Sequence, residues 1–222
     1  MRSVCVSLIV FVCLTMTLSA CTPITSLSSF AELKRVTFIL KVEPLENDLE
    51  YLAAYELGTK ELREKFMEYI EFKDHSLDLI PADNIIGYKI RYKSDDEEVV
   101  GFVSAPADYQ NKNYPVLLYN RGGGPGLTLN EPSHIRFLAQ FGFIVLASQY
   151  RGADGGTGKD EFGGADVNDV VKLIDLAEML SFASGKIYML GWSRGAMQTY
   201  ITLSKDDRID AAVCGAGLPI WP

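Results

Sequence analysis

Short, almost wholly apolar segments that alternate with helical segments constrain the fold of this chain most strongly. Three apolar runs occupy residues 115–119, 143–147 and 186–190. Strands of a parallel sheet have this composition, because helices cover both faces of the sheet. Helical patterns at residues 132–140, 165–180 and 193–204 separate or follow these runs, and residues 211–216 have the composition of a further strand. The alternation predicts an α/β fold, a three-layer sandwich with a mostly parallel sheet and right-handed crossovers.

A different pattern precedes the apolar runs. Residues 85–92 alternate between apolar and polar side chains, which is typical of a strand with one buried face. Residues 93–98 are charged, and residues 99–104 have the pattern of a returning strand, so we expect an N-terminal antiparallel hairpin. Residues 30–82 favour a mostly helical segment that ends at a Pro-Ala-Asp-Asn break. These patterns predict a helical segment at residues 30–82 and an α/β domain at residues 83–222.

The N-terminus has the layout of a secretory signal peptide. Met1-Arg2 precedes an unbroken run of apolar and small residues at 4–20. The run ends in Leu-Ser-Ala-Cys, which resembles the lipobox of bacterial lipoproteins, where the Cys becomes the lipidated first residue. We expect a signal peptide at residues 1–20, lipidation at Cys21 and a tether at residues 21–29. An uncleaved anchor is the alternative, and in both cases the protein is exported and attached to the membrane on the periplasmic or cell-surface side.

Charge and composition argue against several kinds of partner. The formal net charge is -8, whereas a nucleic-acid surface needs a basic patch that releases counterions from phosphate. The two histidines, His75 and His134, are far apart in the sequence and lie at no metal-ligand spacing. We therefore expect no nucleic acid, metal or cofactor. Cys214 lies in an apolar run and is expected to be a buried structural residue.

One motif carries recognisable chemistry. Residues 191–195, Gly-Trp-Ser-Arg-Gly, match the pattern G-x-S-x-G between the apolar run at 186–190 and the helical pattern that follows. A strand, a sharp turn and a helix in this order expose the serine hydroxyl at the carboxyl end of the sheet, where it faces the positive end of the helix dipole. An ordinary Gly-Ser turn is the alternative. The context predicts that Ser193 is a catalytic nucleophile.

A glycine-rich stretch follows an earlier strand. Residues 120–126 are Asn-Arg-Gly-Gly-Gly-Pro-Gly. A nucleophilic serine needs hydrogen-bond donors for the oxyanion that forms on the attacked carbonyl. In a fold with this motif, one donor is the N–H of the residue after the serine, and another comes from such a loop. We expect an oxyanion hole made by Arg194, Gly122 and Gly123. A flexible turn is the alternative; a phosphate-binding loop is disfavoured, because the loop lacks the required Gly-Lys-Ser or Gly-Lys-Thr.

Four stretches together resemble the catalytic domain of the prolyl oligopeptidase family of serine peptidases. They are residues 118–123, 148–152, 162–170 and 191–195. The resemblance implies an α/β-hydrolase fold, a Ser-Asp-His triad and cleavage of short peptides. It implies Ser193 as nucleophile and Arg194 as an oxyanion donor through its backbone. Many members have a tyrosine in the oxyanion loop where this chain has Arg121, whose guanidinium would either stabilise negative charge or bind a substrate carboxylate. We expect Arg121 and Tyr150 to contact substrate.

The sequence departs from that family after the nucleophile. The acid and the histidine follow the serine in this fold, yet no histidine follows Ser193 in the printed sequence. Asp206, Asp207 and Asp210 come too early for the acid and are expected to be surface charges. His134 is expected to begin a helix rather than to act as a displaced base. The pattern predicts a C-terminally truncated domain that lacks its last strands and two triad members.

Three functions are compatible with these residues. The leading hypothesis is a serine peptidase that acts on short peptides through an acyl-enzyme on Ser193. A carboxylic-ester hydrolase on the same fold is the second, with a small ester as substrate. The third is a catalytically inactive, truncated lipoprotein, since a serine hydroxyl without a base is a poor nucleophile.

Overall fold

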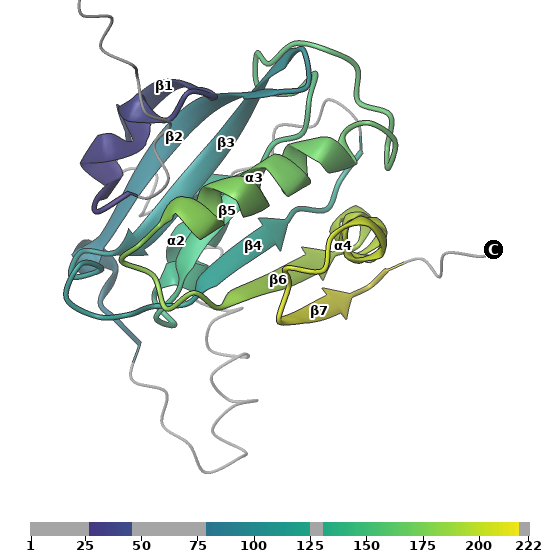
Figure 1. The fold of residues 1–222 in the computed structure, drawn as a ribbon. Coiled ribbons are helices and arrows are strands. Elements are labelled where there is room, and N and C mark those ends of the chain that lie inside the picture. Colours follow the sequence, from purple (N-terminus) through teal and green to yellow (C-terminus); the bar gives the residue numbers. More distant parts are fainter. Residues whose placement is uncertain (1–26, 46–78, 125–130, 218–222) are drawn as a thin grey trace, which may run out of the picture.

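The computed structural model describes residues 27–45, 79–124 and 131–217. The expected signal peptide, Cys21 and most of the segment at 30–82 lie outside the described residues. Within these residues, seven strands form one sheet in the order β1-β2-β3-β5-β4-β6-β7 (Figure 1). The strands are β1 (Ile39–Pro44), β2 (Ile85–Ser94), β3 (Glu97–Pro106), β4 (Val116–Asn120), β5 (Ile144–Ser148), β6 (Ile187–Trp192) and β7 (Ala211–Gly215).

The sheet has an antiparallel part and a parallel part. The pairs β1–β2, β2–β3 and β3–β5 are antiparallel, and the pairs β5–β4, β4–β6 and β6–β7 are parallel. The hairpin expected at residues 85–104 is confirmed as β2 and β3, whose tip includes Asp95 with a φ of 52°. The apolar runs are confirmed as β4, β5 and β6. The sequence therefore predicted the mixed sheet, although its antiparallel part is one strand larger than expected.

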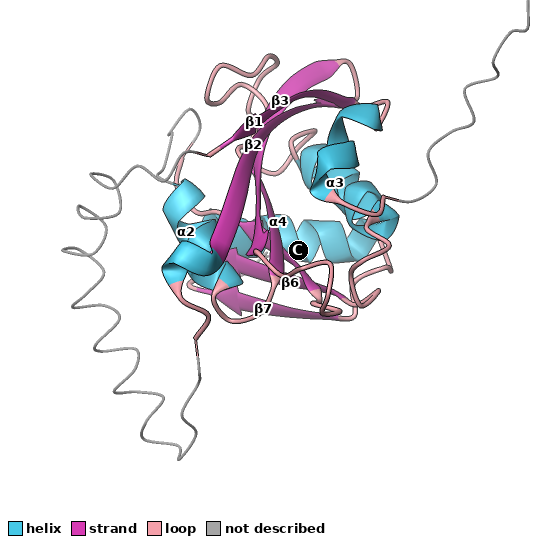
Figure 2. Ribbon diagram, turned by 90° about the vertical axis from the view of Figure 1, so that its left-hand side faces the viewer, coloured by secondary structure: helices cyan, strands magenta, loops and turns pink. Residues whose placement is uncertain are grey.

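Helices cover both faces of the sheet. Helix α2 (Glu131–Ala139) packs on β3 and β5, whereas α3 (Val167–Met179) packs on β4 and β5 and contacts α4 (Arg194–Lys205). Figure 2 shows α2 and α3 on opposite sides of the sheet. Short 3-10 helices η1 (Phe30–Arg35) and η2 (Ala82–Asn84) precede β1 and β2. This is the predicted three-layer α/β sandwich. Among the described residues, none of the helices has the length and apolar character needed to cross a membrane.

Two apolar clusters hold the three layers together. One lies between the sheet and α3 and includes Leu118, Leu146 and Leu173. The other lies between the sheet and α2 and includes Val145 and Ile135. Neighbouring residues of β5 thus point to opposite faces, as a strand requires. Apolar and polar residues do not alternate in β5, because both faces of the strand are buried.

The N-terminal segment differs from the expectation in two ways. Residues 39–44 form the strand β1 rather than helix, because they pair with β2 and extend the sheet. Leu27, which was expected in a solvated tether, is fully buried in the same core as Phe30 and Leu33. Residues 46–78 of the expected helical segment lie outside the described residues. The described part of the chain before residue 83 therefore packs against the α/β domain.

Core packing predicts a specific stability difference. Leu146 is fully buried in β5, whereas Leu203 on α4 is 40% exposed. The Leu146→Ala substitution should lower the free energy of unfolding by about 2–5 kcal/mol, since it removes buried methyl groups and leaves a cavity. The matched Leu203→Ala substitution should change it by less than about 0.5 kcal/mol. Urea unfolding followed by circular dichroism measures both, and equal effects of the two substitutions would contradict this packing.

Candidate active site

Ser193 occupies a sharp turn between β6 and α4. Its φ of 54° and ψ of -116° lie in a region that residues with a side chain seldom adopt, and such a conformation costs about 1–3 kcal/mol. The Ser193 N–H donates to the carbonyl of Gly215 at 2.8 Å, which ties the turn to the neighbouring β7. The Ser193 side chain is exposed, whereas Arg194 and Gly195 beside it are buried. This is the geometry that the motif predicted for an exposed nucleophile.

The two glycines of the motif are required by close backbone contacts. A Cβ at Gly195 would collide with the carbonyl oxygen of Asn120, and one at Gly191 would collide with the carbonyl oxygen of Gly195. Asn120 also donates from its side chain to the Thr199 hydroxyl at 2.9 Å. The end of β4 and the first turns of α4 are therefore in direct contact beside Ser193.

The glycine-rich loop after β4 lies next to the nucleophile. Strands β4 and β6 are parallel neighbours, and Asn120 pairs with Gly191, so the segments that follow both strands meet at one edge of the sheet. A Cβ built on Gly122 would lie 3.4 Å from the Ser193 Cβ. Gly123 has a φ of 86°, which favours glycine. The structure thus brings Gly122 and Arg194 to Ser193, as the oxyanion prediction requires; Gly123 is the next residue of the loop.

Arg121 and Tyr150 do not lie where a substrate-contacting residue is expected. Both side chains are fully buried. The Arg121 guanidinium donates to the carbonyls of Gly122 at 3.0 Å and Gln149 at 2.7 Å. The Tyr150 hydroxyl donates to the Arg121 carbonyl at 3.1 Å. The expected substrate contacts are therefore not supported, because these two buried side chains form hydrogen bonds with the backbone at the start of the glycine-rich loop.

The Arg194 side chain is buried in a cluster of charges that the sequence did not reveal. Its guanidinium donates to Asp160 at 2.5 and 2.7 Å and to Asp166 at 2.7 Å. Asp166 also accepts from Gln198 of α4 and from the Gly163 N–H at 3.0 Å. The Arg194, Asp160 and Asp166 side chains are 1%, 5% and 0% exposed. These ion pairs fix the start of α4 to the segment that links β5 to α3.

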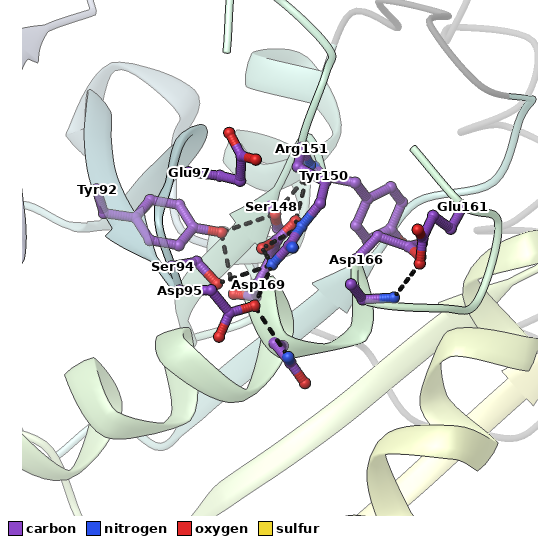
Figure 3. A network of polar contacts seen from close by, with 12 residues as sticks. Tyr92, Ser94, Asp95, Glu97, Ser148, Tyr150, Arg151, Glu161, Asp166 and Asp169 are labelled. Atoms are coloured by element: carbon purple, nitrogen blue, oxygen red, sulfur yellow. Dashed lines mark hydrogen bonds and ion pairs between the residues drawn. The ribbon is translucent and has the colours of Figure 1, made fainter. Parts of the chain in front are cut away.

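A second buried network anchors the same linking segment at its other end (Figure 3). The Arg151 guanidinium donates to Asp169 of α3 at 2.7 Å and to Asp95 of the hairpin tip at 2.8 Å. The Arg151 N–H also donates to Asp169 at 2.7 Å. Burial raises the pKa of Asp169 above its usual value, and the Arg151 hydrogen bonds oppose that rise. Arg151 thus joins the hairpin, the linking segment and α3.

The other residues singled out in the sequence lie away from Ser193 or outside the described part of the chain. Asp210 accepts from Lys186 and from the Ile187 N–H at the start of β6, whereas Ser193 follows the end of that strand. Asp206 accepts from Arg208, and Asp207 is exposed. His134 is exposed in α2, where its ring stacks on Tyr119 with centroids 6.2 Å apart.

The remaining predictions concern cysteines and metals. Cys214 is half-buried in β7. Cys21 and His75 lie outside the described residues. Within residues 27–45, 79–124 and 131–217, no group of three or more His, Cys, Asp or Glu residues could hold a metal ion.

Comparison with known families supports the resemblance seen in the sequence. Residues 130–221 match the family model described as the prolyl oligopeptidase family. This part of the chain is therefore similar to the prolyl oligopeptidase family. The matched region includes Ser193, Arg194 and the linking segment with Asp160 and Asp166.

Two curated relatives are similar to part of this chain. The chain is 32% identical over 123 residues to an uncharacterized peptidase, YtmA, of Bacillus subtilis, covering 55% of this chain and 47% of that protein. It is 28% identical over 138 residues to Dipeptidyl-peptidase 5 of Porphyromonas gingivalis, covering 56% of this chain and 20% of that protein. The chain thus spans about half the length of the first relative and a fifth of the second.

Solved structures show the same fold. A solved structure from Legionella pneumophila matches 81% of this chain and 52% of its own chain, with a TM-score of 0.55 and 17% identity. The α/β hydrolase GrgF from Penicillium matches 60% of this chain and 46% of its own, with a TM-score of 0.50 and 16% identity. The fold is therefore that of α/β hydrolases.

The buried ion pairs of Arg194 predict a pH-dependent stability. Burial disfavours the ionised form of Asp160, but hydrogen bonds from Arg194 and the Phe162 N–H outweigh it and hold the pKa of Asp160 below its usual 3.8. The ionised carboxylate therefore stabilises the folded state above that pH, and this contribution disappears as the pH falls through the folded-state pKa. The Asp160→Asn substitution should lower the free energy of unfolding by about 1–3 kcal/mol at neutral pH and by progressively less below pH 3.8.

Urea unfolding between neutral pH and pH 3 measures this difference. The exposed Asp207 provides the matched control, and Asp207→Asn should unfold like the wild type at neutral pH. A difference between wild type and Asp160→Asn that stays constant across this range would contradict the role assigned to the carboxylate.

Proposed function

We propose that the protein is a serine hydrolase in which Ser193 attacks the carbonyl carbon of a short peptide substrate. The observation that carries the proposal is the strained, exposed Ser193 turn beside Gly122 of the glycine-rich loop. The hydroxyl oxygen would form a bond to the acyl carbon, and the leaving amine would depart with a proton. Water would then hydrolyse the acyl-enzyme and restore the serine. The relative described as a peptidase supports a peptide substrate.

The described residues supply the electrostatic part of this reaction. The N–H groups of Arg194 and Gly122 would donate to the oxyanion of the tetrahedral intermediate, where fixed dipoles act without reorganisation. The first turn of α4 adds its positive dipole end at the same place. A general base is also needed to take the Ser193 proton, and no histidine follows Ser193 in the printed sequence. Without such a base, an oxyanion hole and binding still retain about 10³–10⁴-fold catalysis over water.

Covalent labelling with a fluorophosphonate tests the nucleophile. We expect the 222-residue chain to be labelled slowly, because the donors are present and no histidine follows the serine. Ser193→Ala should abolish labelling. Ser204→Ala removes an exposed hydroxyl near the C-terminal end of α4 and should leave labelling unchanged. Added imidazole should accelerate labelling of the wild type by acting as an external base and should have no effect on Ser193→Ala.

Three outcomes separate the alternatives. Labelling that survives in Ser193→Ala contradicts Ser193 as nucleophile, and no labelling with or without imidazole favours a catalytically inactive chain. If Ser193 is labelled, a panel of dipeptide p-nitroanilides and short-chain p-nitrophenyl esters distinguishes a peptidase from an ester hydrolase. Hydrolysis of the anilides at a rate above that of the uncatalysed reaction supports a peptidase. Hydrolysis of the esters without hydrolysis of the anilides contradicts a peptidase.

We also propose that the protein is exported and lipidated at Cys21. The sequence Leu-Ser-Ala-Cys at the end of the apolar run supports this proposal. In bacterial cells fed an alkyne analogue of palmitate, the wild-type protein should incorporate the label and sediment with membranes. Cys21→Ser should lose the label, whereas Cys214→Ser should keep it. Label retained in Cys21→Ser would contradict lipidation at this position.

A further inference from the structure

Two chain segments that supply the proposed oxyanion donors meet at one side chain. Tyr150 lies just after β5, next to β4 in the sheet, and its hydroxyl donates to the Arg121 carbonyl at 3.1 Å. That carbonyl belongs to the peptide unit whose N–H is that of Gly122. The Tyr150 ring centroid also lies 4.8 Å from the Arg121 guanidinium carbon and 4.5 Å from that of Arg194. One ring therefore contacts residues of both donor segments.

Tyr150 is itself held in a fixed position. Its φ of 64° is unusual for a residue with a side chain, and such conformations persist only where the surroundings determine them. The Tyr150 N–H donates to the Ser148 hydroxyl at 2.9 Å, and that hydroxyl accepts from Tyr92 at 2.7 Å. The next residue, Arg151, is bound to the buried Asp169 (Figure 3). The backbone that carries the ring is thus tied to β5, β2 and α3.

The Arg194 side chain is held by residues other than Tyr150 as well. Asp160 and Asp166 accept from its guanidinium, and the Phe162 ring centroid lies 4.7 Å from it. Guanidinium groups pair with carboxylates and stack on aromatic rings in defined planes. Because Arg194 is the first residue of α4, fixing its side chain restricts its backbone N–H beside Ser193.

We propose that Tyr150 and the Arg194 side chain are positioning residues that hold the N–H groups of Gly122 and Arg194 at a fixed separation around Ser193. This inference rests on the proposed function. Oxyanion donors act at about 2.7–3.1 Å from the developing charge. A displacement of about 1 Å costs on the order of 10²-fold in rate. Both side chains are buried, so they act through the backbone donors rather than through contact with substrate.

Substitutions of Tyr150 separate its hydroxyl hydrogen bond to the Arg121 carbonyl from its ring contacts with the two guanidinium groups. Tyr150→Phe removes the hydrogen bond to the Arg121 carbonyl and keeps the ring, and it should slow fluorophosphonate labelling of Ser193 by about tenfold. Tyr150→Leu removes the hydrogen bond and the aromatic ring, and it should slow labelling by about 10–100-fold. Asp166→Asn removes the negative charge that pairs with the Arg194 guanidinium. This substitution should slow labelling by about 10–100-fold, like Tyr150→Leu. Binding of a trifluoromethyl ketone, which forms a tetrahedral adduct with serine, should weaken in proportion, whereas the KM for an ester should stay unchanged.

Tyr109→Phe is the matched control. Tyr109 is also buried, and its hydroxyl accepts one hydrogen bond from the Phe30 N–H at 3.2 Å. Thermal unfolding should show similar destabilisation of Tyr109→Phe and Tyr150→Phe, while only Tyr150→Phe labels slowly. If folded Tyr150 and Asp166 variants label like the wild type, or if Tyr109→Phe slows labelling equally, the inference is wrong. If the wild type does not label at all, the proposed function fails and this inference is overturned with it.

Discussion

The contact between the start of α4 and the end of β4 is the constraint on which the rest of the site depends. Gly195 approaches the carbonyl of Asn120 so closely that no side chain fits between them. This approach fixes the direction in which the chain leaves β6, and the strained backbone of Ser193 follows from it. It also brings the glycine-rich loop to the nucleophile, because that loop starts from Asn120. The parallel pairing of β4 with β6 makes the contact possible.

The strained turn at Ser193 is surrounded by loops with buried polar contacts. The loops around it carry buried charges that form pairs, Arg151 with Asp169 and Arg194 with Asp166. Buried ion pairs give little net stability when compared with well-packed apolar residues, whereas removal of one partner is costly. Their contribution is therefore to select one arrangement of the linking segment between β5 and α3. That arrangement places Tyr150 and Arg194 against each other.

The sequence predicted the parts of the structure that depend on local patterns. Apolar runs predicted β4, β5 and β6, and the motif at residues 191–195 predicted the turn at Ser193, because burial and glycine content are visible in single segments. The strand β1 was missed, since its pairing with β2 is a long-range contact that residues 39–44 do not encode alone. Arg121 and Tyr150 were assigned to substrate because an arginine or tyrosine near a nucleophile fits that role. Their burial depends on how the segments after β4 and β5 pack against each other and against the start of α4.

A crystal structure of the phosphonylated protein tests the central claim most directly. The claim is that the segments after β4 and β6 converge on Ser193 to form one oxyanion site. The account predicts a covalent bond to the Ser193 hydroxyl oxygen and a phosphonyl oxygen at about 2.7–3.1 Å from the N–H nitrogens of Arg194 and Gly122. A phosphonyl oxygen that points to solvent, or an adduct on another residue, would contradict it.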